Sequence, residues 1–355
     1  MEILNVAYIN SKSSSGASKV CLQLTEAINL TNKGNAQTYS VGDHSINVNG
    51  VFVRPHKSLI YDLKTSLKTK DIIVVFHGVW LPRYWLLAFN LILLDIPYVV
   101  FPHGSIVRSG LKKSLLKKVF SFPIVYCFVR KSKFIHFLNL EEQKNSFFLS
   151  KKFVSISNGI ELIKGDVRKK DKKIVFIGRI DVHHKGLDLL VNAVSKLNDF
   201  SEYLFEIYGD GPEKEMVKLR KMIEASNCDS KIKLYPGRLN EIQIVSLLNS
   251  SAGFVHTSRY EGEPLMVLNA LHNNCPVFAT EATNCKNIVH SKNGLICGNS
   301  ADSISKMLPK FIKNITQDKY QPYLDLDDRS WHKIAVKVIN QYKCKLGFEK
   351  NISRD

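Results

Sequence analysis

The chain has 355 residues, of which 45% are hydrophobic and 23% are charged, and it carries a formal net charge of +18. This much apolar material suffices for two ordinary domains and excludes an intrinsically disordered protein. The seven cysteines are an odd number and include no Cys-x-x-Cys pair, which favours neither a disulfide framework nor a zinc site and indicates a reducing compartment.

The amino-terminal end shows no basic leader and no signal-type cleavage site. Residues 3–9 predict a first strand instead, and we therefore expect a cytoplasmic protein. Short apolar runs then alternate with helical patterns through the first half of the chain. The predicted strands are residues 3–9, 72–76, 98–101, 135–138 and 154–156, and the clearest helical patterns are 20–30, 111–120 and 140–149. This alternation is typical of a parallel sheet with helices on both faces.

Positive charge is concentrated in this first half. Residues 1–160 contain 20 Lys plus Arg against 8 Asp plus Glu, a charge of +12. The segment 108–133 has eight basic residues and no acidic one, interleaved with apolar residues. Such a segment predicts contact with an anionic membrane surface, each cation contributing about 1 kcal/mol, and a solvated basic helix is the alternative. Residues 85–94 are strongly apolar but fall short of the roughly 20 residues that span a bilayer.

A hinge is expected between two domains. Asn158 and Gly159 are followed by a polar, Lys-rich stretch that continues to residue 173. The strand pattern then restarts at residues 174–177, 204–208, 231–235, 253–256 and 277–279, and a last helix with one apolar stripe follows Ser330. We therefore predict an α/β protein with two Rossmann-like doubly wound domains, at residues 1–157 and 158–324.

The first strand of the second domain ends in Gly178 and Arg179, and Lys185 precedes the next helical pattern. The two cations would bracket a strand-to-helix loop at the carboxyl end of a parallel strand, where open α/β sheets bind ligands. Arg supplies a bidentate donor and Lys a point charge for a diphosphate. Two solvated loop cations are the alternative. His183 and His184, in the same turn, are interpreted as loop residues.

A second candidate site begins at Glu261, in a tight Gly turn just before an apolar helix. Pro264 suits the first helical position, so the free N–H groups of the turn that starts at Leu265 would be available to a phosphate group. The Glu261 carboxylate is left to bind hydroxyls. An acidic surface turn before an ordinary buried helix is the alternative. Asp325 and Asp327 are interpreted as favouring the start of the last helix and not as metal ligands.

Taken in this order, these residues resemble the second domain of the family 4 retaining glycosyltransferases, which have the two-domain GT-B fold and use nucleotide-activated sugars. The resemblance extends over most of the chain and includes residues 208–212, 253–258, 276–280 and 293–296. In the first half, residues 101–104 and the loop 14–17 look like that family's acceptor-side and glycine-loop motifs.

The resemblance implies roles for individual residues. Arg179 and Lys185 would hold the donor diphosphate and stabilise its charge as the glycosidic bond breaks. Glu261 would contact hydroxyls of the donor sugar, and His103 would reach the reacting region from the opposite side of a cleft between the domains. The implied catalytic residues are therefore His103, Arg179, Lys185 and Glu261. The implied donor-binding residues are Gly16, Gly178, Arg179, Lys185, Glu261, Pro264, Leu265 and Asn269.

The resemblance also implies a metal-independent reaction with no cofactor, since the nucleotide sugar is a co-substrate. A helix at about residues 325–345 would cross back and complete the first domain. The expected activity is retaining hexosyl transfer to a saccharide acceptor, lipid-linked, in the synthesis of a surface polysaccharide such as O-antigen, capsule or exopolysaccharide. The protein would then work on the inner face of the cytoplasmic membrane. No nucleic-acid reader module is found, so no nucleic-acid partner is expected.

Three departures from the family pattern leave an alternative function open. Asn269 stands where the family has a second Glu that binds the nucleotide ribose, and an amide lacks the charge of a carboxylate. The loop at Ser15 and Gly16 has one glycine where relatives often have two, and Thr283 and Asn284 replace a Gly-rich turn. The alternative function is a non-catalytic nucleotide-sugar-binding subunit with a degenerate donor site.

Overall fold

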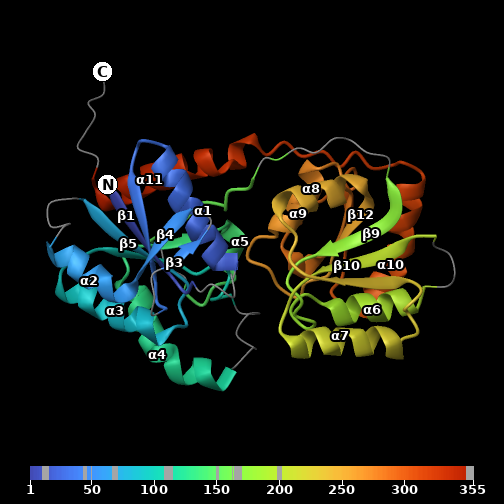
Figure 1. Cartoon of the computed structure of the whole chain (residues 1–355), viewed down its shortest axis with the longest axis horizontal. Coiled ribbons are helices and arrows are strands. Elements are labelled where there is room, and N and C mark those ends of the chain that lie inside the picture. The colour runs from blue at the N-terminus through green and yellow to red at the C-terminus, as the bar shows by residue number, and fades with distance from the viewer. Residues whose placement is uncertain are drawn as a thin grey trace. The chain divides into compact units, whose positions relative to one another are not determined.

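A computed structural model describes residues 1–9, 16–42, 46–48, 50–65, 71–107, 115–148, 152–161, 163, 170–197 and 202–348. The chain divides into two compact units (Figure 1). The first unit contains Met1–Glu161 together with the carboxy-terminal Asp328–Asp355, and the second unit is Leu162–Asp327. The division thus falls a few residues after each of the predicted boundaries at 157 and 324.

The first unit is built on one eight-stranded sheet with the order β3-β4-β2-β1-β5-β6-β7-β8. Neighbouring strands are parallel except for β3 and β4. The strands are β1 (Glu2–Ala7), β2 (Asn35–Ser40), β3 (Ile46–Val48), β4 (Val51–Pro55), β5 (Ile72–His77), β6 (Tyr98–Phe101), β7 (Ile135–Phe137) and β8 (Phe153–Ser155). The helices are α1 (Gly16–Leu30), α2 (His56–Thr65), α3 (Pro82–Leu93), α4 (Leu115–Lys131), α5 (Leu140–Lys144) and α11 (Trp331–Leu346).

Both faces of this sheet are covered. Every residue of β1 and of β5 is buried, as expected for central parallel strands. Because successive side chains of a strand point to opposite faces, Leu4 and Val74 pack in one hydrophobic cluster while Ile3 and Ile73 pack in another. The predicted doubly wound fold of the first domain is confirmed.

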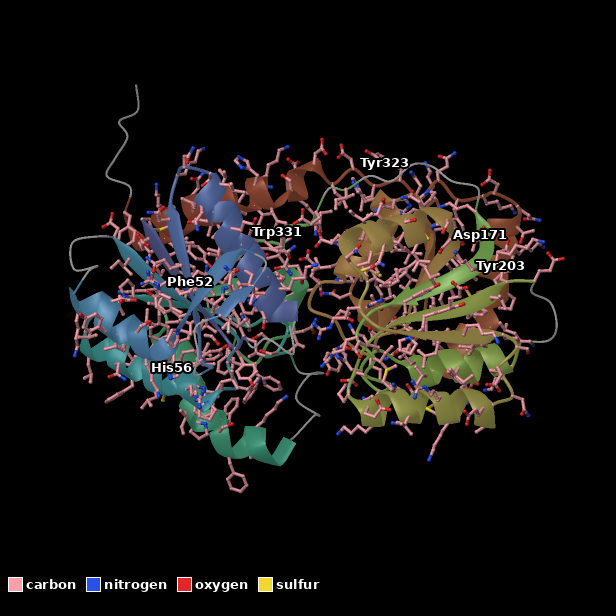
Figure 2. The ribbon with its side chains drawn as sticks, viewed as in Figure 1. Phe52, His56, Asp171, Tyr203, Tyr323 and Trp331 are labelled. Carbon is pink, nitrogen blue, oxygen red and sulfur yellow. The ribbon has the colours of Figure 1, made fainter. Side chains whose placement is uncertain are left out.

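The last helix of the chain packs on this unit. Ser330 caps α11 by accepting a hydrogen bond from the Lys333 backbone, and the expected apolar stripe of α11 lies in the same cluster as Ile3. Trp331, labelled in Figure 2, lies at its amino-terminal end. A Cβ atom added to Gly159 would lie 2.3 Å from the Trp331 ring, so the start of the hinge is pressed against α11.

We expect Gly159→Ala to lower the free energy of unfolding by about 1–3 kcal/mol, because the added methyl group overpacks a buried ring. Gly34→Ala is the matched control, since its nearest neighbour is also on α11, Ile339, but at an ordinary contact distance of 3.4 Å. Urea unfolding of both variants measures the difference. Equal stabilities would show that the hinge moves away from Trp331 without cost.

Two helical predictions differ from the structure. The pattern at 111–120 continues as α4 to Lys131, although Pro123 lies inside it, because Val125, Phe128 and Val129 are buried at helical spacing and anchor the second half. Residues 108–114 lie outside the described residues. The helix predicted at 140–149 ends at Lys144. In the described part of the chain, no helix is both long and apolar enough to cross a bilayer.

The second unit is built on a six-stranded sheet with the order β11-β10-β9-β12-β13-β14, and all neighbouring strands are parallel. The strands are β9 (Asp171–Ile177), β10 (Leu204–Gly209), β11 (Ile232–Pro236), β12 (Ser251–His256), β13 (Val277–Thr280) and β14 (Gly294–Cys297). The helices are α6 (Leu187–Ser195), α7 (Glu213–Ala225), α8 (Glu241–Ser250), α9 (Leu265–His272) and α10 (Ala301–Thr316). The second doubly wound domain is therefore confirmed.

Candidate functional site

Two loops of the second unit leave the same edge of its sheet. β9 ends at Ile177 and leads through Gly178 and Arg179 to Lys185, just before α6. β12 ends at His256 and leads to Glu261, just before α9. Since β9 and β12 are hydrogen-bonded parallel neighbours, both loops start at the carboxyl edge, where ligands bind in open α/β sheets.

The Glu261 carboxylate is the centre at which the two loops meet. Its Oε1 lies 2.7 Å from Lys185 Nζ, 2.7 Å from Ser258 Oγ and 3.1 Å from His256 Nε2. The Lys185 and Glu261 side chains are only 15% and 13% exposed. Three donors thus converge on one oxygen, and nothing among the described residues hydrogen-bonds to the other oxygen, Oε2.

These donors keep Glu261 ionised. Burial by itself would raise the pKa of Glu261, but Lys185, His256 and His184 hold the pKa of this carboxyl well below its ordinary value. Burial lowers the pKa of His256, against the opposing effect of Glu261. A neutral His256 donates to Glu261 through Nε2, and its buried Nδ1 has no hydrogen-bond partner in the described parts of the chain.

His184 links Arg179 to the loop that carries Glu261. Its Nδ1 lies 3.3 Å from Arg179 Nη2, its Nε2 lies 3.0 Å from the Tyr260 carbonyl oxygen, and its ring stacks on the Tyr260 ring at 4.1 Å. Burial lowers the pKa of His184 to about 4, so the neutral ring accepts from Arg179 and donates to Tyr260. His184 therefore lies in the predicted loop and also connects Arg179 to the loop that carries Glu261.

Arg179 and Lys185 belong to one cluster but differ in how far their side chains are buried and held by an ion pair. The positive charges of both side chains lower the pKa of His184. Lys185 is buried against Glu261, whereas the Arg179 side chain is 56% exposed and its only ion pair among the described residues is a 3.4 Å contact with Asp181. Lys185 has three N–H donors and uses one for Glu261, so two remain for a ligand.

Gly186 places Lys185 against the end of β12. Its φ is 61°, and an added Cβ atom would lie 2.0 Å from the Thr257 carbonyl oxygen. Thr257 Oγ1 donates to the carbonyl oxygens of Lys185 (3.1 Å) and Gly186 (3.0 Å). A residue with a side chain would disturb this contact, so Gly186 and Thr257 set the position of Lys185. Thr257, Ser258 and His256 lie in the segment 253–258 that carries part of the resemblance, but no role was predicted for them, and their position a few residues before Glu261 was the available signal.

The start of α9 differs from the prediction. Pro264 is the residue before the helix, with φ −85° and ψ 74°, and Leu265 is the first helical residue. The backbone N–H groups of Leu265 and Val267 donate to the carbonyl oxygens of Glu263 and Pro264. The sequence predicted free N–H groups in this first turn. The N–H groups of Leu265 and Val267 are instead hydrogen-bonded within the chain. Pro264 could not take the first helical position because its ψ is not helical.

Asn269 and Asn284 are two of the three departures from the family pattern. Asn269 lies half-buried on α9, with its Nδ2 4.0 Å from Met266 Sδ. Asn284 has φ 61°, a left-handed conformation that Asn adopts more readily than most residues, and its Nδ2 donates to the Gly262 carbonyl oxygen at 3.3 Å. Asn284 thus supplies the turn that a glycine would make and supports the loop of Glu261.

The predicted residues of the first unit are His103 and Gly16. His103 follows β6 with φ 50°, its ring stacks on Phe101 at 3.8 Å, and its Nε2 lies 2.9 Å from His77 Nδ1. Gly16 is the first residue of α1 and is exposed, and among the described residues no atom beyond its chain neighbours lies within 4 Å of an added Cβ. Ser14 and Ser15 of the same loop lie outside the described residues.

Comparison with known proteins gives three kinds of match. Residues 160–323 match the family model "Glycosyl transferases group 1". Over 204 residues the chain is 29% identical to TuaC of Bacillus subtilis (strain 168), described as a glycosyltransferase of teichuronic acid biosynthesis. This match covers 53% of the chain and 47% of TuaC, so the chain spans about half the length of that relative.

Two solved structures share the fold of this chain over nearly its whole length. Sucrose-phosphate synthase (tll1590) from Thermosynechococcus elongatus has a TM-score of 0.71 and 13% identity, with 98% of this chain and 100% of that one covered. Anabaena Alr3699/HepE in complex with UDP and glucose has a TM-score of 0.72 and 15% identity, with 98% and 99% covered. At these identities the likeness shows the fold alone.

Proposed function

Because residues 160–323 match the model of the group 1 glycosyltransferases, we propose that this chain is a member of that family and that it transfers a sugar from a nucleotide-sugar donor to a saccharide acceptor in the synthesis of a surface polysaccharide. One observation carries the proposal: the Lys185–Glu261 pair, with Arg179 beside it, lies at the carboxyl edge of the second sheet. TuaC, which is described as acting in teichuronic acid biosynthesis, and HepE, which is described in complex with UDP-glucose, support the acceptor and donor classes.

Lys185 and Arg179 bind the donor diphosphate in this proposal. The exposed Arg179 guanidinium offers a planar fork for two phosphate oxygens, and Lys185 offers its two remaining N–H donors. Negative charge grows on the diphosphate as the bond from the anomeric carbon to the phosphate oxygen breaks. Lys185, held by Glu261 before the reaction, stabilises that charge without reorganisation, and Arg179 adds a second cation beside it.

Glu261 orients the donor sugar. Because Lys185, Ser258 and His256 all bind Oε1, the second oxygen Oε2 can accept a hydrogen bond from a sugar hydroxyl. A carboxylate that stays ionised makes a stronger hydrogen bond to a hydroxyl than a neutral acceptor does. The low pKa of Glu261 supports this role and speaks against its acting as a general acid near neutral pH.

The reaction proceeds with retention and without a metal. The acceptor oxygen forms its bond to the anomeric carbon on the face from which the phosphate leaves, and the acceptor proton passes to the departing phosphate oxygen. No protein nucleophile takes part in this front-face step. Asp325 and Asp327 are the acidic pair whose spacing most resembles a metal-binding motif. The Asp325 carboxylate instead accepts a hydrogen bond from the Asp327 backbone N–H, with Oδ1 at 3.0 Å.

Donor hydrolysis tests the activity against the alternative of a non-catalytic binding subunit. Purified protein is incubated with UDP-, GDP- and ADP-sugars without an acceptor, and free sugar is measured. An enzyme slowly hydrolyses at least one donor, and the Lys185→Ala variant hydrolyses it more slowly. Binding of a donor in calorimetry with no hydrolysis and no transfer to any saccharide acceptor would favour the binding subunit.

We expect Asn269→Glu to preserve or improve donor binding, because a carboxylate at this position on α9 restores a charge-assisted hydrogen bond to the nucleotide ribose. Asn269→Gln is the matched control, since it adds the same length without the charge. Calorimetric titration with the preferred donor compares the two. Loss of donor binding in Asn269→Glu would remove position 269 from the ribose site.

A membrane surface is proposed as the place where the acceptor is met. Helices α3 and α4 contact each other (Figure 1). Both helices expose apolar side chains. The exposed apolar residues are Leu86, Phe89, Ile92, Leu93, Val119, Phe120, Ile124 and Tyr126. Lys118, Arg130, Lys131 and Lys133 lie in or just after α4. An apolar face with flanking cations fits an anionic lipid surface, and a lipid-linked saccharide on the inner face of the cytoplasmic membrane is the acceptor we propose.

Phe120, which is 82% exposed, should matter most on this surface. We expect Phe120→Ser to weaken binding to vesicles of anionic lipid about tenfold or more, since a buried Phe contributes about 1.5–3 kcal/mol. Ile242→Ser is the matched control, because Ile242 is 73% exposed but lies on α8 of the second unit. Co-sedimentation at low salt measures both. A wild-type protein that stays in the supernatant would refute membrane binding.

A further inference from the structure

A chain of hydrogen bonds in the first unit connects a helix carbonyl to His103. Thr25 Oγ1 of α1 donates to the Cys21 carbonyl oxygen at 2.9 Å, and Asn5 Nδ2 of β1 lies 2.9 Å from Thr25 Oγ1. Asn5 Oδ1 lies 3.0 Å from His77 Nε2 at the end of β5, and His77 Nδ1 lies 2.9 Å from His103 Nε2. Asn5, Thr25 and His77 are buried, at 0%, 2% and 3% exposure.

The hydrogen bond from Thr25 to Cys21 determines which atom donates in each of the other hydrogen bonds of this series. A carbonyl oxygen can only accept, so the single hydroxyl proton of Thr25 points to Cys21. The Thr25 oxygen therefore accepts from Asn5, which turns the amide nitrogen of Asn5 to Thr25 and its oxygen to His77. His77 must then carry its proton on Nε2, and its Nδ1 is left as an acceptor.

Both histidines are neutral, so each carries one ring proton. Burial lowers the pKa of His77 to about 3 and holds the pKa of His103 well below its ordinary value, with a further effect of His77 on His103. Because His77 Nδ1 accepts, His103 Nε2 must donate. The lone pair of His103 is then on Nδ1, which makes no hydrogen bond within the described residues, and the residue is only partly buried.

We propose that Asn5 and His77 are positioning residues that hold His103 with its proton on Nε2, so that Nδ1 accepts a hydrogen bond from a hydroxyl of the reacting sugars. This inference rests on the proposed function for the identity of the hydroxyl, but not for the tautomer. A histidine with the opposite tautomer would turn a donor toward the hydroxyl. These buried hydrogen bonds exclude one of the two tautomers of His103 before any sugar binds. The ring is therefore preorganised for the hydroxyl.

The tautomer can be read directly by long-range ¹H–¹⁵N correlation NMR of protein labelled at histidine, at neutral pH. His103→Gln identifies the signals of His103 by their loss. We expect Nδ1 of His103 in the shift range of an unprotonated ring nitrogen and Nε2 in that of a protonated one. A wild-type His103 with the proton on Nδ1 would overturn the inference whether or not the protein transfers sugar.

Asn5→Asp tests the relay itself. A carboxylate cannot donate to Thr25 and favours a charged His77, which then donates from Nδ1 and moves the His103 proton to its own Nδ1. We expect inverted His103 signals and a fall in kcat of at least tenfold, larger than any change in KM for the donor. His136 is the internal control, because its Nε2 donates to the Ile156 carbonyl oxygen and its Nδ1 accepts from Tyr342, so its signals should not move.

The outcomes separate the two proposals. Inverted signals with unchanged kcat would overturn the positioning role, as would unchanged His103 signals in a folded Asn5→Asp variant. Should Asn5→Asp fail to fold, Thr25→Val frees the Asn5 amide to turn, and we expect both His103 tautomers to appear. A wild-type protein with the expected tautomer that transfers no sugar would refute the proposed function and leave the relay standing.

Discussion

Lys185→Ala is expected to lower the turnover of sugar transfer by about 10²–10³-fold, the usual loss when one donor to a developing negative charge is removed. The variant loses a cation beside the breaking bond, and affinity for the donor falls as well. Arg179→Ala should show the same kind of loss. Single-turnover rates with bound donor separate chemistry from binding, and unchanged rates in both variants would rule out a leaving-group role for these cations.

The same substitution should also destabilise the protein. Lys185 and Glu261 form a nearly buried ion pair, and removing one partner of such a pair costs about 3–5 kcal/mol because the other charge stays buried. Lys196→Ala is the matched control, since Lys196 also lies 2.7 Å from a carboxylate, that of Asp302, but both side chains are exposed. An exposed pair contributes about 0–1 kcal/mol. Chemical unfolding of the two variants should therefore differ by several kcal/mol.

Replacing the glutamate as well should recover part of this loss. In Lys185→Ala with Glu261→Gln no buried charge is left unpaired, so the double variant should be more stable than Lys185→Ala alone. Sugar transfer should remain low, because both the cation and the ionised hydroxyl acceptor are absent. A double variant as unstable as the single one would mean that Glu261 is not held by Lys185.

Gly186→Ala is expected to have the second largest effect. The left-handed backbone costs about 1–2 kcal/mol for a residue with a Cβ, and the new atom would lie 2.0 Å from the Thr257 carbonyl oxygen. The backbone must move, and Lys185 moves with it away from Glu261. We expect transfer activity and unfolding free energy to fall together.

Gly347→Ala isolates the backbone cost, because Gly347 has a similar φ of 70° but, in the part of the chain that the structure describes, no atom beyond its chain neighbours lies within 4 Å of an added Cβ. Its unfolding free energy should fall by the backbone term alone and its transfer activity should be unchanged. Equal stability and equal activity for the two variants would show that the contact between Gly186 and Thr257 does not position Lys185.

Much of the fold was predictable because buried parallel strands are continuous apolar runs. β5 and β9 are short runs of this kind, flanked by polar residues, and both were predicted. β2 (Asn35–Ser40) was not, because its sequence is polar: Thr38 and Ser40 are buried but hydrogen-bonded to Thr25 and Ile9. Buried polar residues that find partners far along the chain leave no periodic signal.

The candidate site was predictable as a list of residues but not as an arrangement. Arg179, Lys185 and Glu261 stand out because each follows an apolar run that predicts a parallel strand, and ligands bind at the carboxyl ends of such strands. His184 and His256 do not, since a histidine in a turn or at a strand end has many ordinary explanations. Their contacts with Arg179 and Glu261 depend on β9 and β12 being neighbours, which is a property of strand order and not of local sequence.

The relay to His103 shows the same limit. Asn5, Thr25, His77 and His103 are separated by 20 residues or more along the chain. Asn5 lies within β1, Thr25 on α1, His77 at the end of β5 and His103 just after β6. His103 was predicted from the family resemblance of residues 101–104, but nothing in the local sequence around Asn5 or His77 indicates a connection. Only the parallel pairing of β1 with β5, and of β5 with β6, brings them together.

The central claim is that Arg179 and Lys185 bind the same diphosphate. Calorimetric titration of the wild-type protein with nucleoside diphosphates and the matching monophosphates, from a panel of uridine, guanosine and adenosine nucleotides, tests it most directly. For the preferred base, we predict that the diphosphate binds more tightly than the monophosphate, and that this difference shrinks in Arg179→Ala and in Lys185→Ala. An equal difference in the wild type and both variants, or no binding of any nucleotide, would contradict the account.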